Sequence, residues 1–284
     1  MPIRSEKWSV GCAVHLIRRG VRNCVITKND SDKWRHLEVM YYLNDINSGL
    51  NSIRDVKLAV NNGELKIFQW PGVWGPREPL FTLAAFTLLD THIHQIGFEI
   101  RESGISKYMH KSGISMAKFS NIKYGEKGSL YQTPYGARHI NTDRYMRIVA
   151  PYVMCKNVFE MHPKGYKWCT LHFEEAWEWA VRYPFSSLGD YAEKRNSPIV
   201  DTRELKKILG GPGEFKQLCK DMIYGKEEIT DEEAGFLEYG GMSALTPGVN
   251  KHQKTQHQVV LTPGVKRLAN QGRSNNAIGG GITT

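Results

Sequence analysis

Two histidines separated by a single residue, His92 and His94, lie in the most apolar stretch of the chain, residues 80–100. If this stretch is a β-strand, both imidazoles project from the same face, because side chains alternate between the two faces. Two such rings can chelate one divalent cation and leave coordination sites open for water and phosphate oxygens. The alternative is a pair of surface histidines on an amphipathic strand.

Tyr152 lies in a predicted helix, residues 143–160, which Thr142 can cap and which Pro151 must kink or restart. A phenolate there could attack a phosphodiester and form a covalent phosphotyrosine, while a cation neutralises the charge that develops. Lys156 follows one helical turn later on the same face, where it could activate the tyrosine or bind phosphate. Both side chains also have structural explanations: Tyr152 could simply pack in the core, and Lys156 could be an exposed helix lysine.

The pattern of apolar residues predicts the elements that position this chemistry. His15 lies on a predicted first strand, residues 9–17, where it either lines the same site or is a half-buried histidine. A further strand is predicted at residues 65–70, and residues 80–100 form either two strands or one strand with a bulge. Helices are predicted at residues 30–41, 105–123, 143–160, 173–181, 203–209 and 214–222. This order predicts an α+β fold, a central antiparallel sheet with helices packed on one face.

The composition argues against several classes of protein. Hydrophobic residues make up 40% of the 284 residues, and no apolar run approaches the roughly 18 to 20 residues of a membrane-spanning helix. The five cysteines form no CxxC pair, which argues against a disulfide framework and a zinc ribbon. We therefore expect a cytoplasmic protein without a membrane partner, whose net charge of +9 suits a nucleic acid.

Basic and aromatic side chains that could hold a single strand occur in three segments. Proteins that bind single strands combine a basic track for the backbone with aromatic rings for the bases. The candidates are Arg18, Arg19 and Arg22 beside the first strand, Lys107, Lys111 and Lys118 on the helix at residues 105–123, and Tyr131 and Arg138 in the following loop. The helix lysines could equally form a solvated face.

The order of the motifs resembles that of the REP-associated tyrosine transposases, single-tyrosine transposases of the insertion-sequence type in the HUH endonuclease superfamily. The resemblance covers roughly residues 10–222 and rests on seven motifs in the family's order. They are residues 14–22 (VHLIRRGVR), 29–34 (NDSDKW), 92–94 (HIH), 104–109 (GISKYM), 123–132 (KYGEKGSLYQ), 143–145 with 151–153 (DRY, PYV) and 182–187 (RYPFSS).

The resemblance implies a ferredoxin-like sheet, a nucleophile at Tyr152, and a divalent metal, Mg²⁺ or Mn²⁺, at His92 and His94. It also implies a substrate of single-stranded or hairpin DNA, cleaved through a covalent 5′-phosphotyrosine. The members of the family include both homodimers and monomers. The chain departs from the family one turn after the tyrosine, where Lys156 replaces an Asn or Gln that helps to hold the metal. Asn157, after a shift of register, could supply that ligand.

The sequence thus predicts a metal-dependent single-stranded DNA endonuclease and strand transferase, nucleoid-associated if the source is bacterial. The predicted catalytic domain spans residues 1–182, followed by a helical extension at 183–239 and a disordered basic tail at 240–284 that carries two LTPGV repeats. One alternative is a domesticated protein that binds hairpin DNA without cleaving it. Another is an RNA-binding protein with a structural zinc ion.

Overall fold

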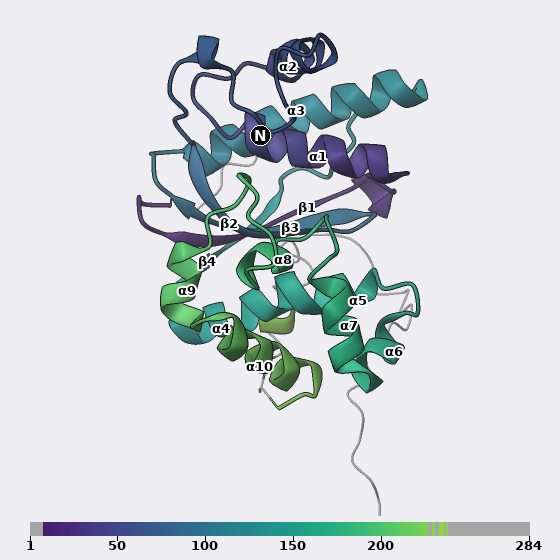
Figure 1. The fold of residues 1–284 in the computed structure, drawn as a ribbon, viewed down its shortest axis with the longest axis vertical. Coiled ribbons are helices and arrows are strands. Elements are labelled where there is room, and N and C mark those ends of the chain that lie inside the picture. Colours follow the sequence, from purple (N-terminus) through teal and green to yellow (C-terminus); the bar gives the residue numbers. More distant parts are fainter. Residues whose placement is uncertain (1–7, 227–228, 231–232, 236, 238–284) are drawn as a thin grey trace, which may run out of the picture. The chain divides into compact units, whose positions relative to one another are not determined.

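A four-stranded antiparallel sheet positions the histidine pair (Figure 1). The computed structural model describes residues 8–226, 229, 230, 233–235 and 237. The strands are β1 (Ala13–Arg19), β2 (Phe81–Leu88), β3 (His92–Glu99) and β4 (Gly136–Ile140), in the order β2-β3-β1-β4. Residues 80–100 therefore form two strands, and β2 carries an irregularity of register between Leu83 and Ala85.

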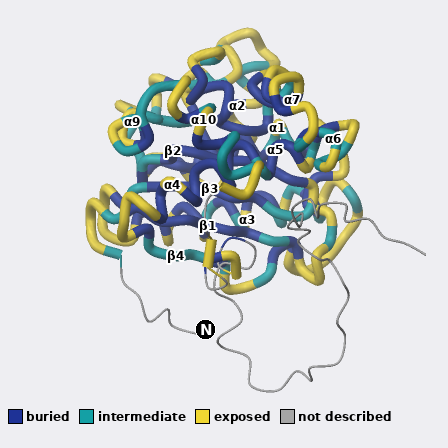
Figure 2. Tube along the Cα trace, turned by 90° about the horizontal axis from the view of Figure 1, so that it is seen from below, coloured by how far each residue is buried: buried dark blue, intermediate teal, exposed yellow. Residues whose placement is uncertain are grey.

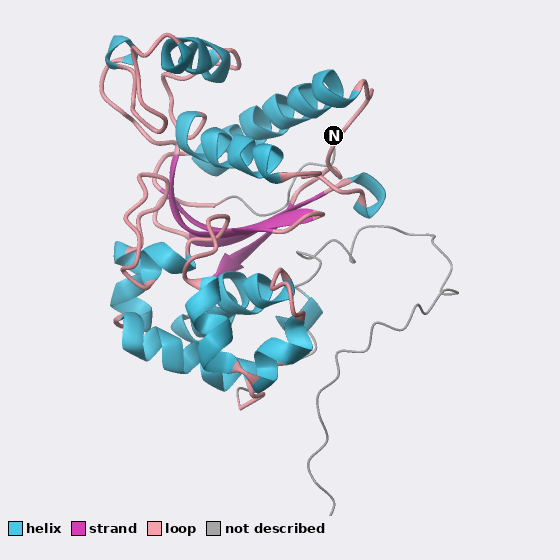
Figure 3. Cartoon of the chain, turned by 45° about the vertical axis from the view of Figure 1, so that its right-hand side comes forward, coloured by secondary structure: helices cyan, strands magenta, loops and turns pink. Residues whose placement is uncertain are grey.

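Helices cover both faces of this sheet, as Figures 1 and 3 show. One face carries α1 (Asp30–Tyr42) and α3 (Gly104–Tyr124), with α2 (Ser52–Asn61) packed on α1. The other face carries α4 (Asp143–Pro151), a π-helical turn (Tyr152–Lys156), α5 (Asn157–Glu160), α6 (Tyr166–Leu171), α7 (Phe173–Ala180), α8 (Leu188–Tyr191), α9 (Arg203–Leu209) and α10 (Pro212–Ile223). Within the described residues, no helix is long and apolar enough to cross a membrane.

The prediction of helices on one face only is wrong, and the strand sequences explain why. Residues 13–17 (AVHLI) and 81–88 (FTLAAFTL) are apolar at nearly every position, which is typical of strands that are buried on both faces. Leu16 and Ile93 pack in the core beneath α1 and α3, whereas Ala13 and Ile96 pack in the core beneath α4. The strands accordingly form the buried interior in Figure 2.

The start of α1 is held by a small polar network. The Asn29 side chain accepts a hydrogen bond from the backbone N–H of Asp32, and the Asp32 carboxylate accepts one from the backbone N–H of Lys28 at 2.7 Å. The same carboxylate accepts hydrogen bonds from Lys123 and Tyr124 on α3, each at 2.6 Å. Burial raises the pKa of Asp32, but these hydrogen bonds outweigh it, and the pKa lies below its ordinary value.

The strand predicted at residues 65–70 does not form. Phe68 has a φ of +59°, outside the extended region, and its ring stacks on Tyr42 with 6.4 Å between ring centres. The aromatic residues that suggested a strand therefore anchor a loop to α1. Phe68 and Trp70 are partly buried there, whereas Ile67 is 54% exposed.

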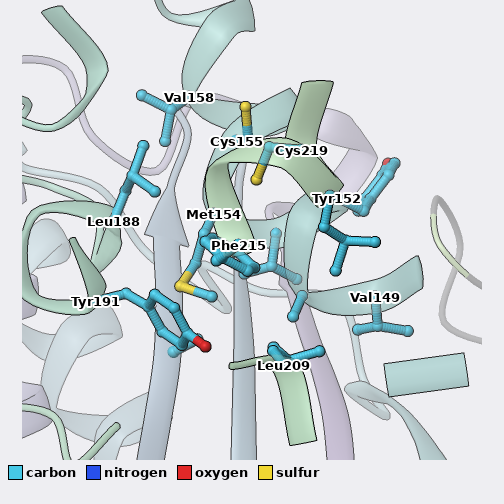
Figure 4. Packing of buried hydrophobic residues seen from close by; sticks show 14 of the residues in the cluster. Val149, Tyr152, Met154, Cys155, Val158, Leu188, Tyr191, Leu209, Phe215 and Cys219 are labelled. Carbon is cyan, nitrogen blue, oxygen red and sulfur yellow. The ribbon is translucent and has the colours of Figure 1, made fainter. Parts of the chain in front are cut away.

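The helices after residue 183 do not build a separate core. Leu188, Tyr191, Leu209 and Phe215 lie in the same apolar cluster as Met154 of the π-helical turn (Figure 4). The predicted boundary at residue 182 thus does not divide two cores, because the extension completes the layer that holds Tyr152. The tail predicted at residues 240–284 lies outside the described residues.

Candidate active site

The two histidines of β3 project from the same face of the sheet. On the neighbouring strand β1, Arg19 is the register partner of His92, and Ile17 is the partner of His94. The two imidazole centres are 4.9 Å apart, and the rings meet at 71°. His94 is fully buried and His92 is partly exposed, so the pair lies at the edge of the interior.

His15 lies on the same face of the sheet and contacts the ring of His94. Its Nε2 lies 3.0 Å from Nδ1 of His94, and the two rings stack at 5.2 Å between centres with an angle of 17°. Nε2 of His94 is buried and has no hydrogen-bond partner among the described residues. A buried ring nitrogen is costly to leave unpaired, so this atom marks a place for a further ligand.

This contact resolves the question that the sequence leaves open about His15. It is a fully buried partner of His94, 79 residues away in the chain. The sequence indicated only that His15 lies on a strand. Its pairing with His94 depends on the alignment of β1 with β3, which the local sequence does not show. If His94 carries its proton on Nδ1, it donates to His15 and presents a lone pair at Nε2, the arrangement that metal-binding histidines use.

The helix that carries Tyr152 widens directly after Pro151. Residues 152–156 form a π-helical turn, in which the backbone N–H of Asn157 donates to the carbonyl of Tyr152. Pro151 has no N–H to donate and interrupts the regular helical pattern, and π-helical turns are frequent at functional sites. Because this bond joins residues five apart, Asn157 as well as Lys156 follows Tyr152 by about one turn.

Tyr152, Lys156 and Asn157 lie in this turn or directly after it. The Tyr152 ring lies 5.6 Å from the His94 ring between centres, and Figure 4 shows it at the edge of the apolar cluster. The Lys156 ammonium lies 4.8 Å from the centre of the Tyr152 ring and 2.6 Å from the carboxylate of Glu160. Asn157 is only 1% exposed, and neither atom of its amide has a hydrogen-bond partner among the described residues.

Burial and positive charge keep the histidines neutral. Burial, followed by the charges of Arg19 and Lys156, lowers the pKa of His92 to about 3. Burial is also the main reason that the pKa of His15 falls to about 3 and that the pKa of His94 lies well below its ordinary value. All three imidazoles are therefore neutral at physiological pH, which is the form that can bind a metal ion.

Three of the predicted DNA-binding side chains are bound to the protein itself. The Arg18 guanidinium is buried, lies 5.0 Å from the centre of the buried Tyr131 ring, and donates to Ser112 at 3.0 Å. Lys111 donates to the backbone carbonyl of Asp45 at 2.7 Å. The assignment of Arg18, Lys111 and Tyr131 to a DNA track is therefore corrected, because these groups already have partners within the protein.

The other predicted DNA-binding residues are not gathered in one place. Arg19 is next to His92, and Arg138 on β4 is the register partner of His15, with its guanidinium 4.7 Å from the Tyr145 ring centre. Arg22, Lys107 and Lys118 are exposed. The two lysines belong to α3, which covers the face of the sheet opposite to the histidines. They are consequently not gathered beside Tyr152.

Comparisons with known proteins identify no family for this chain. No family model and no curated protein matches it. One solved structure is similar. It is the structure of a REP-associated tyrosine transposase bound to a REP hairpin, with 13% sequence identity, a TM-score of 0.37, and coverage of 71% of this chain and 93% of that chain.

Proposed function

We propose that the protein is a metal-dependent enzyme that cleaves and rejoins single-stranded DNA beside hairpins, with Tyr152 as the nucleophile. The observation that carries this proposal is the position of Tyr152 against His94, with 5.6 Å between the ring centres and with His92 on the same face of β3. A tyrosine whose ring packs against a neutral imidazole of such a pair suits the transfer of a phosphodiester. The identity of the DNA follows from the resemblance of the sequence motifs.

His92, His94 and Asn157 would hold the divalent metal, Mg²⁺ or Mn²⁺. The buried Nε2 of His94 and the buried amide of Asn157 both lack hydrogen-bond partners among the described residues, as ligands of an added ion would. Within that part of the chain, no group of three or more His, Cys, Asp or Glu side chains is arranged to hold a metal, and the third protein ligand in this proposal is the amide of Asn157. When bound, the ion would neutralise the charge on the phosphodiester and on the leaving oxygen.

The side chains of this protein would divide the remaining work. The Tyr152 phenolate forms a bond to phosphorus while the bond from phosphorus to the 3′ oxygen breaks, which leaves a 5′-phosphotyrosine and a 3′ hydroxyl. Attack by a 3′ hydroxyl on the phosphotyrosine reverses these bond changes and rejoins a strand. Arg19 and Lys156 attract the phosphate, and His15 keeps the proton of His94 on Nδ1.

We further propose that the sheet is ferredoxin-like. The strands and their main crossovers, α1 and α3, follow the order β-α-β-β-α-β, and the strand order β4-β1-β3-β2 is that of a split βαβ arrangement. The layer of helices from α4 onward would then be an addition that covers the second face.

A second candidate is a protein that binds hairpin DNA without cleaving it. The charges of Arg19 and Lys156, which contribute to the lowered pKa values of His92 and His94, favour this reading. The same charges repel a metal ion at that place while they attract phosphate.

A covalent-adduct assay tests the proposal and separates the two candidates. The full chain is incubated with end-labelled hairpin DNA and Mn²⁺, and protein–DNA species that survive denaturing electrophoresis are measured. We expect an adduct that disappears with Tyr152→Phe and with EDTA but persists with Tyr145→Phe, a control at a buried tyrosine of the same helical segment. An adduct that survives Tyr152→Phe refutes the nucleophile, whereas hairpin binding with no adduct favours the second candidate.

A further inference from the structure

A series of aromatic rings links the helices that follow Tyr152 to α1 on the other side of the sheet. Successive ring centres lie 4.6 to 5.6 Å apart. We call this series the aromatic band. In spatial order, its members are Trp168, His162, Trp179, Tyr183, Phe185 and Trp34.

The band is exposed at its two ends and partly exposed between them, except at the buried rings of His162 and Phe185. Trp34 is 42% exposed. At the other end, the exposed ring of His172 extends the band by stacking on Trp168, with 4.4 Å between centres and 7° between planes. Trp168, Trp179 and Tyr183 are partly exposed between these ends. A lone exposed ring is ordinary, but several exposed or partly exposed rings linked in one series indicate a surface that a ligand covers.

Lysines accompany the band. The ammonium of Lys164 lies 4.1 Å from the centre of the Trp168 ring, and that of Lys33 lies 5.5 Å from the centre of the Phe185 ring. Rings with cations over them suit a ligand that carries both flat apolar groups and negative charge. Nucleic acid has this combination, since its bases stack and its phosphates are anionic.

The band also reaches the turn that leads into the histidine pair. Lys33, next to Trp34, forms an ion pair with Asp90 at 3.0 Å, and Asp90 lies two residues before His92. The backbone N–H of Leu88, at the end of β2, donates to the carbonyl of Phe185 at 2.9 Å. The Phe185 end of the band is therefore tied to the β2–β3 turn.

We propose that the aromatic band binds a single strand of nucleic acid and leads it toward Tyr152. Bases stack on aromatic faces whatever their sequence, and only an unpaired strand can present these faces. The stacked pair of His172 and Trp168 ends in an exposed ring on which a base can continue the stack. The role as a path to Tyr152 rests on the proposed function, whereas binding by the band does not require cleavage.

Binding of a labelled single strand to the full chain tests this proposal. A fluorescent oligodeoxythymidine is titrated in EDTA into the Tyr152→Phe protein, so that no cleavage contributes. Adding either Trp34→Ala or His172→Ala to this protein should raise the Kd for the single strand by about fivefold or more, because one base loses its stacking partner. Trp34→Phe should largely restore binding, and Tyr224→Ala, at a 46% exposed tyrosine outside the band, should leave Kd within about twofold.

Photocrosslinking gives a second measurement that does not depend on how the variants fold. An iodouracil-substituted strand should crosslink the unaltered protein at residues 162–185 or at Trp34. Crosslinks confined to α3, or Kd values for the Trp34 and His172 variants that match the Tyr224 control, would overturn the proposal. The proposal would also be overturned if a duplex of the same length bound equally well and the Trp34→Ala and His172→Ala variants weakened its binding to the same extent. The contacts would then be to the nucleic-acid backbone rather than to unpaired bases.

The outcomes for the band and for the proposed function are distinguishable. If the band variants lose single-strand binding and the cleavage assay gives no covalent adduct, binding by the aromatic band is supported and the endonuclease activity is refuted. If an adduct forms that depends on Tyr152 while the band variants bind the single strand unchanged, the endonuclease activity is supported and binding by the aromatic band is refuted.

Discussion

Replacement of His15 by phenylalanine isolates the role of the ring behind the proposed metal site. The change keeps a flat ring next to His94 but removes the nitrogen that lies 3.0 Å from Nδ1 of His94. The His94 proton can then move to Nε2, the atom that would face the metal. Loss of such a supporting partner typically lowers metal affinity about 10- to 100-fold, which corresponds to about 1.4 to 2.7 kcal/mol.

His15→Phe should also lower the stability of the metal-free protein. Nδ1 of His94 is fully buried and would lose its partner, which costs about 1 to 3 kcal/mol in the free energy of unfolding. His36→Phe is a matched control, because burial lowers the pKa of His36 to about 3 as well, but this residue lies on α1, on the opposite face of the sheet. We expect the control to lose stability without losing affinity for Mn²⁺.

Calorimetric titration of the full chain with Mn²⁺ measures the effect, and urea unfolding without metal measures the stability. His15→Gln, whose amide can accept a hydrogen bond, should recover part of the affinity. If His15→Phe binds Mn²⁺ within about twofold of the unaltered protein while His94→Ala does not bind, the argument about the tautomer is refuted.

Three further predictions concern the widened turn and the stability of the fold. In Mn²⁺ titrations, Asn157→Ala should weaken binding by about tenfold, whereas Lys156→Gln should strengthen it, because a repelling charge is removed. Gly104→Ala should lower the urea unfolding free energy by about 1 to 3 kcal/mol, because the added Cβ would collide with the carbonyl oxygen of Leu80. Asp32→Asn should cost about 1 to 3 kcal/mol at pH 7, and the cost should shrink as acid protonates Asp32. Because the folded pKa of Asp32 is lowered, its contribution is present above the ordinary carboxyl pKa and is lost as pH falls through the folded value, which a pH series of unfolding curves measures.

Local signals were sufficient for most of the helices. The Thr142 side chain caps α4 by accepting from the backbone N–H of Tyr145, and α9 spans the residues that its spacing predicts, 203–209. Such features depend on residues within one or two turns of each other, which the sequence displays directly. The strand predicted at residues 65–70 failed because Phe68 packs on a helix that lies far away in the sequence.

The site around the histidine pair depends partly on the local sequence and partly on the tertiary structure. One-residue spacing puts His92 and His94 on one face of any strand, whatever the rest of the fold does. The contact of His15 with His94 depends instead on the register of β1 against β3, and the burial of Arg18 depends on acceptors that α3 supplies. Contacts of this kind leave no periodic trace in the sequence, because they are set by which distant segments pair.

The shift of register that makes Asn157 a candidate ligand has the same origin. Pro151 marks the place where the helix is interrupted, and this is visible in the sequence. The turn at residues 152–156 also packs against α10 and the sheet, which are distant in the sequence. The residue types thus limit the chemistry to an imidazole pair, a tyrosine and a nearby lysine or amide, while the packing of distant elements brings His15, His94 and Tyr152 into contact.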